Sequence, residues 1–220
     1  FQQLRPDMSL TDKVIKNTIY YILSQIIGFV FPLFLTPFII AYIGHVELGI
    51  YALVLGFTGT IGLFDISISN SFIKFISEYY NKKQFKELNE VINTGLLFYL
   101  IFALVCCTIG FLFAEPLLGT LNIPENLFEM SVFAFKISLA IFFIITAFGI
   151  YNSVLISLQK MYLSSMLGTV ISLLNFIAII ILLSNGFGMV GLLLSQLTAT
   201  LLSIALSFII AKRELPQMEF

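Results

Sequence analysis

The chain has 220 residues, of which 59% are hydrophobic and 10% are charged, and its formal net charge is −1. Soluble domains carry about 25% charged residues, so this composition excludes an ordinary soluble globular protein. The mean hydropathy of +1.04 indicates an integral membrane protein whose apolar segments face lipid.

Six stretches are apolar enough to be membrane-spanning helices, each of which needs about 20 residues. They are residues 17–43, 48–80, 91–114, 127–158, 163–183 and 189–211. Short links make consecutive helices antiparallel. The sequence therefore predicts an all-α polytopic membrane protein in which residues 17–211 form one six-helix bundle. Residues 1–16 precede the bundle, and residues 1–7, ahead of Met8, are interpreted as non-native or upstream sequence.

The first predicted helix contains Pro32 and Pro37. Each proline removes a backbone donor and clashes with the preceding turn, so this helix is expected to bend. The bend is either a static kink, which neighbouring helices satisfy, or a hinge for alternating access.

The second predicted helix carries a polar stripe over its last turns. At 100° per residue, Ser67, Asn70, Ser71 and Lys74 share one face, and Ser77 and Glu78 continue it. This pattern is typical of a helix that lines a watery cavity. The alternative is a helix end that protrudes from the membrane and is wetted there, with Lys74 reaching outward.

Asp65 lies in the same helix but on another face, together with Ser69. A carboxylate in hydrocarbon is costly, so Asp65 is expected to face a neighbouring helix. Two interpretations stay open. Asp65 either belongs to a fixed hydrogen-bond network or changes its protonation or partner during transport and thereby couples it to ion flow.

Polar residues are sparse in the later helices. Lys136 lies about two turns inside the fourth predicted helix, with Glu129 seven residues earlier on the same face. Lys136 either reaches toward Glu129 or faces a cavity where it would meet an anionic substrate. Asn175 of the fifth helix and Gln196, Thr198 and Thr200 of the sixth are expected mainly to join helices by hydrogen bonds.

Lysine and arginine residues predict the orientation of the bundle. Ten of the eleven flank the spans on one side: Arg5, Lys13, Lys16, Lys74, Lys82, Lys83, Lys86, Lys160, Lys212 and Arg213. The links on the other side contain none. By the positive-inside rule both termini are cytoplasmic.

Metal and cofactor chemistry has no support in the sequence. The two cysteines, Cys106 and Cys107, are adjacent within an apolar run, and His45 is the sole histidine. Adjacent cysteines match no metal-ligand spacing, and buried ones behave as small hydrophobic residues. We expect no metal, no cofactor and no nucleic-acid partner.

Four segments together resemble a known family. They are "YIGHVELGIYALV" at 42–54, "FDISISNSFIKFISEYY" at 64–80, "NSVLISLQKMYLSSMLGTVISLLNF" at 152–176 and "NGFGMVGLLLSQLTAT" at 185–200. Their order and spacing resemble the N-terminal half of bacterial polysaccharide exporters, the Wzx-type flippases of lipid-linked oligosaccharides. These belong to the multidrug/oligosaccharidyl-lipid/polysaccharide exporter superfamily.

The resemblance implies one of two six-helix lobes around a central cavity, with residues 212–220 as a cytoplasmic linker toward a second lobe. It implies that the protein lies in the bacterial cytoplasmic membrane and flips undecaprenyl-pyrophosphate-linked sugars by alternating access. A pyrophosphate site needs several cations, and this half offers Lys136 and Lys74.

Three other classes of protein compete with a flippase. A cation-coupled multidrug antiporter of the same superfamily is weakened because the first helix, 17–43, has no acidic residue. A non-transporting membrane scaffold stays open. A membrane enzyme is not expected, because the outer acids Glu47, Glu115, Glu125 and Glu129 do not cluster.

Overall fold

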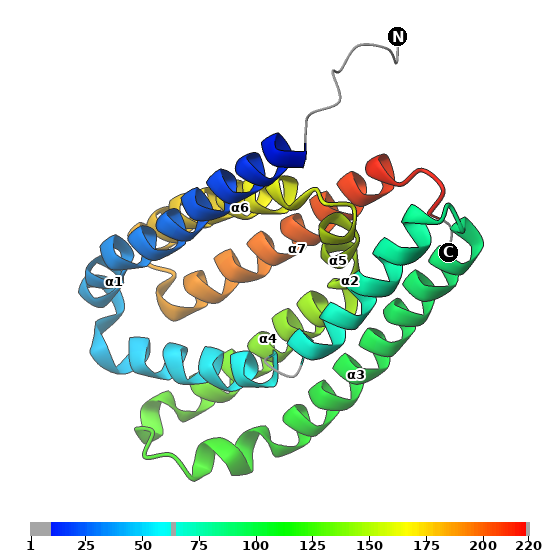
Figure 1. The fold of residues 1–220 in the computed structure, drawn as a ribbon. Helices are drawn as coiled ribbons and strands as arrows, with labels where there is room; N and C mark the ends of the chain where they lie inside the picture. Colours follow the sequence, from blue (N-terminus) through cyan, green and yellow to red (C-terminus); the bar gives the residue numbers. More distant parts are fainter. Residues whose placement is uncertain (1–9, 63–64, 219–220) are drawn as a thin grey trace.

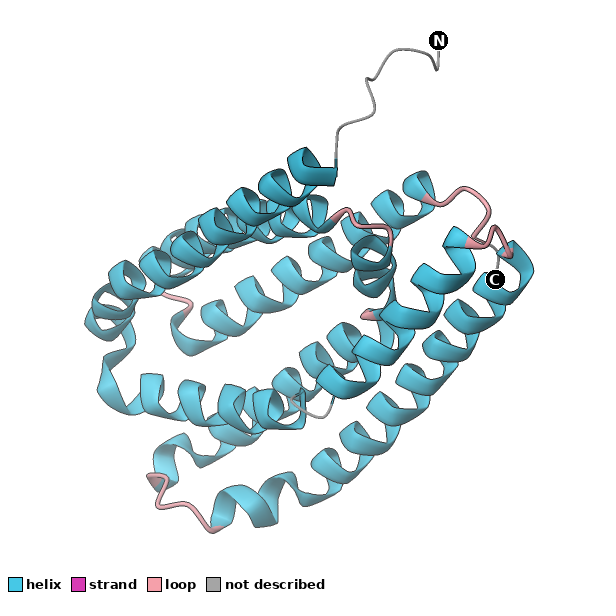
Figure 2. Ribbon diagram, in the orientation of Figure 1, coloured by secondary structure: helices cyan, strands magenta, loops and turns pink. Residues whose placement is uncertain are grey.

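The computed structural model describes the backbone of residues 10–62 and 65–218, and the side chains of residue 15, residues 18–60 and residues 68–218. These residues form helices and turns without any strand (Figures 1 and 2). The helices are α1 (Leu10–Gly62), α2 (Asp65–Asn81), α3 (Phe85–Gly119), α4 (Glu125–Phe148), α5 (Ile150–Ser157), α6 (Met161–Ser184) and α7 (Gly188–Glu214). The predicted all-α class is confirmed.

Five stretches of the described chain are long and apolar enough to cross a membrane. They are 18–60, 85–119, 125–157, 161–184 and 188–214. The first has 43 residues, which at about 1.5 Å per residue is far longer than a bilayer core of about 30 Å. This stretch consists of two helical parts that meet at a sharp turn. It therefore accounts for the first predicted span and the start of the second.

The turn between the two arms of α1 is made by a single residue, Gly44. Its dihedral angles are φ 77° and ψ 174°, and no other residue of α1 has non-helical values. This backbone region is essentially restricted to glycine. The first arm (residues 10–43) and the second arm (residues 45–62) therefore point in different directions (Figure 1). The break falls at the predicted link and not at Pro32 or Pro37, through which the helix continues.

The second predicted span, 48–80, is divided between two helices. The second arm of α1 ends at Gly62 and α2 begins at Asp65, so the single helix expected here is wrong. Glycines at 56, 59 and 62 lie in the last turns of this arm. Glycine weakens a helix interior by about 0.5–1 kcal/mol, which favours an end there.

Helices α3 and α4 pack closely because of a glycine. A Cβ placed on Gly110 would lie 2.7 Å from a terminal methyl carbon of Leu139. Leu139 is 3% exposed, and the Cys107 thiol donates to its carbonyl oxygen at 3.2 Å. The missing side chain therefore lets the two helices approach.

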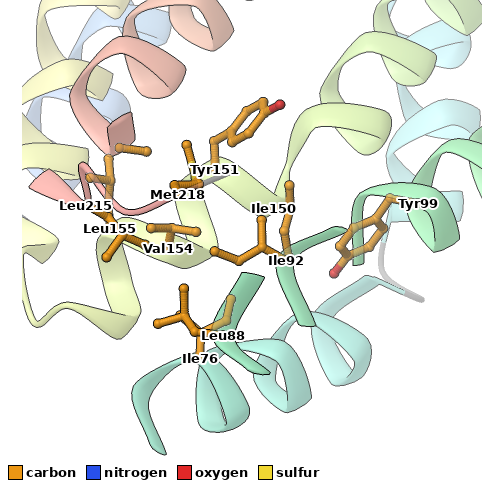
Figure 3. Packing of buried hydrophobic residues seen from close by; sticks show 11 residues of the cluster. Ile76, Leu88, Ile92, Tyr99, Ile150, Tyr151, Val154, Leu155, Leu215 and Met218 are labelled. Carbon is orange, nitrogen blue, oxygen red and sulfur yellow. The ribbon is translucent and has the colours of Figure 1, made fainter. Parts of the chain in front are cut away.

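Buried apolar side chains form cores at both ends of the bundle. One end holds the cluster of Figure 3, drawn from α2, α3, α5, α7 and the segment that follows α7. At the other end, two clusters gather the arms of α1 with α3, α4, α6 and the start of α7. The middle of α7 lies between these cores.

The C-terminal segment 215–218 belongs to the first core. Leu215 and Met218 are 0% exposed and lie beside Val154 and Leu155 of α5 (Figure 3). The Asn89 side chain on α3 donates to the carbonyl oxygen of Gln217 at 2.8 Å. The end of the described chain is thus fastened to the start of α3.

Polar contacts bring the α2–α3 turn, the α5–α6 turn and the end of α7 to one end of the bundle (Figure 1). Lys160, between α5 and α6, pairs with Glu214 of α7. Five of the ten cations used to predict orientation lie in these segments, and Lys86 lies at the start of α3 beside them. The cytoplasmic assignment of this end stays a prediction.

Candidate substrate cavity

A polar cavity of about 520 Å³ lies among α2, α4, α5, α6 and α7. Ten of its lining side chains can form hydrogen bonds: Ser69, Asn152, Ser153, Ser164, Ser172, Asn175, Gln196, Thr200, Ser203 and Ser207. The remaining lining residues are apolar or glycine. Because ten uncharged polar side chains gather around one cavity between helices that are long and apolar enough to cross a membrane, this cavity is the candidate functional site.

Two helices supply most of the polar lining by simple periodicity. Along α7 the residues Gln196, Thr200, Ser203 and Ser207 recur at intervals of four, three and four. Along α6, Ser164, Ser172 and Asn175 follow the same face. Side chains three or four residues apart share a helix face, so each helix turns one hydrophilic stripe into the cavity.

The cavity has no charge among its described lining residues. Its groups are hydroxyls and carboxamides, which both donate and accept hydrogen bonds. The chemistry matches a neutral, hydroxyl-rich ligand or bound water, and it offers no counter-charge to an ion.

One carboxamide pair leaves an acceptor unused. Asn175 Nδ2 lies 3.4 Å from Gln196 Oε1, a long hydrogen bond. The Asn175 Oδ1 atom is buried and has no hydrogen-bond partner among the described residues. An unsatisfied buried acceptor costs about 1–3 kcal/mol, so a donor from water or substrate would stabilise this site.

Serine contacts hold the cavity wall on the α2 side. The hydroxyls of Ser69 on α2 and Ser153 on α5 are 3.1 Å apart, and Ser157 donates to the carbonyl oxygen of Ile73 at 3.2 Å. Ser69, which shares a helix face with Asp65, thus meets a neighbouring helix, and the same expectation for Asp65 stays a prediction. Asp65 lies one turn earlier, and its side chain is outside the described residues.

The predicted polar stripe on α2 does not line this cavity. Asn70, Ser71 and Lys74 are exposed on the surface of the bundle, and Lys74 lies 5.9 Å from the Phe75 ring centroid. The side chain of Ser67 is outside the described residues. That these four residues face a substrate in a larger assembly stays a prediction.

Lys136 also lies away from this cavity. It precedes the lining residue Ile145 by nine positions, about half a turn around the helix at 100° per residue. Its Nζ lies 3.8 Å from a carboxylate oxygen of Glu115 on α3 and 4.9 Å from the Phe111 ring centroid. The carboxylate beside Lys136 is thus that of Glu115 on the neighbouring helix α3, and not that of Glu129 on its own helix, which the sequence suggested. A substrate contact by Lys136 stays a prediction.

The expected proline hinge is also untested. The helix dihedrals persist through Pro32 and Pro37, and the Thr36 hydroxyl donates to the carbonyl oxygen of Pro32 at 2.7 Å. The sharp turn of α1 falls at Gly44 instead. Whether either proline moves during transport stays a prediction.

The sequence interpretation treated Asn175, Gln196 and Thr200 as helix-joining residues and overlooked Asn152, Ser164, Ser203 and Ser207. The periodic stripe of α7 was the signal that could have found Ser203 and Ser207. Among the described residues, no group of three His, Cys, Asp or Glu side chains could hold a metal ion.

These features define a multi-pass α-helical membrane protein with a neutral polar cavity inside one bundle. Comparison with known protein families matches residues 21–181 to the MatE family. The chain belongs to the MatE family and is a membrane transporter of the multidrug/oligosaccharidyl-lipid/polysaccharide exporter superfamily. Members of this family are transporters and not enzymes. No curated protein and no solved structure matches the chain.

Proposed function

We propose that this chain is the N-terminal lobe of a flippase that moves lipid-linked oligosaccharides, of the undecaprenyl-pyrophosphate type, across the bacterial cytoplasmic membrane by alternating access. A second six-helix lobe would complete the transport path. The glycan would pass through the protein while the lipid tail stays among the membrane lipids. Membership of a transporter superfamily that includes such exporters supports this proposal.

The observation that carries the proposal is the neutral polar cavity. A glycan presents many hydroxyl groups and needs alternating donors and acceptors, which the ten hydrogen-bonding side chains supply. A site built to hydrogen-bond hydroxyls discriminates strongly against ligands that lack them. The unpaired Asn175 Oδ1 is one acceptor that a sugar hydroxyl would satisfy.

A cation-coupled multidrug antiporter is the second candidate. It would use Asp65, which lies one helical turn before the cavity-lining Ser69. The described lining residues include no acidic side chain, whereas a buried cation requires a compensating charge. The cavity chemistry therefore favours the glycan substrate. A non-transporting scaffold would leave the polar cavity without a use.

Complementation of a flippase-deficient bacterial strain tests the proposal. The lobe expressed together with its second lobe should restore surface polysaccharide, whereas residues 9–213 alone should not. Replacing the cavity amides, as Asn175→Leu and Gln196→Leu, should reduce export about tenfold or more at an unchanged level of protein in the membrane.

The matched control is Thr198→Val. Thr198 is exposed, and its hydroxyl donates only to carbonyl oxygens of its own helix, those of Leu194 and Ser195. This variant should export normally. If the complete transporter expels ethidium but never restores polysaccharide, the antiporter is the correct function.

A further inference from the structure

A second cavity lies on the opposite face of α4, between α3 and α4. It has a volume of about 530 Å³ and is lined mostly by apolar side chains, those of Leu104, Cys107, Phe111, Leu139, Ala140, Phe143 and Ile144. The polar lining residues are Lys136 and Thr108, and the Thr108 hydroxyl donates to the carbonyl oxygen of Leu104 in its own helix. Leu104 and Phe111 are 53% and 57% exposed. In a membrane protein this groove is open to lipid.

The cation in this groove is poorly satisfied. Lys136 Nζ lies 3.8 Å from Glu115, which is beyond hydrogen-bond distance. Among the described residues the ammonium has no hydrogen-bond acceptor, and its closest other contact is the face of Phe111 at 4.9 Å. Its side chain is 35% exposed and that of Glu115 is 68% exposed. The ammonium can therefore still donate three hydrogen bonds to an outside acceptor.

We infer that this groove, which we call the α3–α4 groove, binds an anionic phospholipid. One acyl chain would lie along the apolar lining, and the phosphate would accept hydrogen bonds from Lys136. Charge complementarity selects the headgroup, because a cation at the end of an apolar groove attracts a phosphate joined to hydrocarbon. Glu115 opposes this binding because it repels the phosphate and competes for Lys136. The inference is independent of the proposed function.

A tryptophan reporter in the groove tests the inference. The chain has no tryptophan, so Phe111→Trp places a single fluorophore beside Lys136. The variant chain is reconstituted in phosphatidylcholine vesicles that contain a small, equal fraction of either brominated phosphatidylglycerol or brominated phosphatidylcholine. A single lysine near a membrane enriches anionic lipid by about fivefold, so we expect a two- to fivefold preference for phosphatidylglycerol in quenching.

Two further substitutions should change this preference in opposite directions. Lys136→Met should abolish it, and Glu115→Gln should increase it. A purely structural Lys136–Glu115 ion pair would produce no such increase. If Lys136→Met does not fold, Lys136→Arg should keep the preference, and Glu115→Gln still decides the outcome.

Two controls define the site. A reporter on α1, Phe34→Trp, whose parent side chain is 71% exposed, should be quenched equally by both lipids. Lys86→Met, at the opposite end of α3, should leave the Phe111→Trp preference unchanged. Equal quenching of Phe111→Trp by both lipids, or a preference that survives Lys136→Met, would overturn the inference.

Discussion

Polar side chains in a membrane-spanning bundle must find hydrogen-bond or charge partners within the protein, because hydrocarbon offers them none. Asn175 and Gln196 face one another across the boundary of α6 and α7, and Ser69 meets Ser153. Lys136 has a long ion pair with Glu115 and lies over the ring of Phe111. Ser69 and Ser153 join helices that are 84 residues apart in the sequence, whereas the other two contacts join consecutive helices. Polar side chains therefore link neighbouring helices as well as line the cavity.

Asp65 is the residue for which a titration experiment is most informative. We expect Asp65→Asn to reach the membrane and to lose the pH dependence of transport, because asparagine keeps the shape and the hydrogen bonds but cannot take up a proton. Transport by the complete protein would be measured in vesicles over a range of pH.

The control for Asp65 is Glu78→Gln on the same helix. Glu78 is exposed and pairs with Lys82 at 2.7 Å, so its loss should not alter the pH profile. Normal transport by Asp65→Asn at every pH would identify Asp65 as a member of a fixed hydrogen-bond network.

At the scale of helices, glycine determines where the chain turns and how closely it packs. Gly44 separates the arms of α1, and Gly110 admits the side chain of Leu139. A Cβ placed on Gly95 would lie 2.8 Å from the terminal methyl carbon of Ile150. These two glycines of α3 allow it to pack closely against α4 and α5.

Replacement of Gly44 isolates the backbone effect. Gly44→Ala should destabilise the protein by about 1–3 kcal/mol, because alanine is strained at φ 77° and ψ 174°. A Cβ at this position would contact nothing within 4 Å, so the loss would come from conformation and not from crowding. Thermal unfolding in detergent measures the change.

Gly49→Ala is the matched variant. Gly49 lies in the second arm of α1, and a Cβ there also meets nothing within 4 Å. Because alanine favours a helix by about 0.5–1 kcal/mol, this variant should be neutral or slightly stabilised. Equal effects of the two substitutions would contradict the role assigned to Gly44.

At the scale of the whole molecule, two apolar ends enclose a polar middle. Along α7, residues 189–193 lie in the cores of one end, residues 196–207 line the cavity, and Ala211 begins the core of the other end. The C-terminal segment completes the core that contains Ala211, which is the cluster of Figure 3. The ends therefore hold the bundle together while the middle remains available to a ligand.

The C-terminal segment should contribute measurably to stability. Met218→Ala is expected to cost about 2–5 kcal/mol, because it leaves a cavity where a fully buried side chain was. Met166→Ala provides the comparison, since Met166 is 51% exposed and should change the unfolding temperature little. Similar unfolding temperatures for both variants would show that the segment does not hold the bundle.

Orientation is tested by labelling cysteines from outside the cell. Cys106 and Cys107 are first replaced by alanine, and a cysteine is then introduced at Asn122 or Lys83, both of which are exposed. The excess of cations on one side predicts that Asn122→Cys reacts with an impermeant reagent and Lys83→Cys does not. The opposite pattern would mean that the termini lie outside.

The sequence alone determined that the protein is an all-α membrane protein and where most spans lie. Hydropathy over about 20 residues is a local property and needs no knowledge of neighbours. The link at Gly44 was also predictable, because the apolar stretches on either side are each long enough to span. The division of residues 48–80 was missed because both parts have the sequence pattern of a helix, although the chain becomes more polar from Asp65 onward.

The tertiary structure alone decided how polar residues combine. Ser69, Asn152 and Gln196 lie on three different helices, and nothing in their local patterns shows that they share a cavity. Lys136 has a carboxylate neighbour on its own helix and another on α3, and only the packing of α3 on α4 selects Glu115. Periodicity specifies which side chains share a face of one helix. Which faces meet depends on contacts between distant residues, such as Leu139 over Gly110 and Asn89 with Gln217.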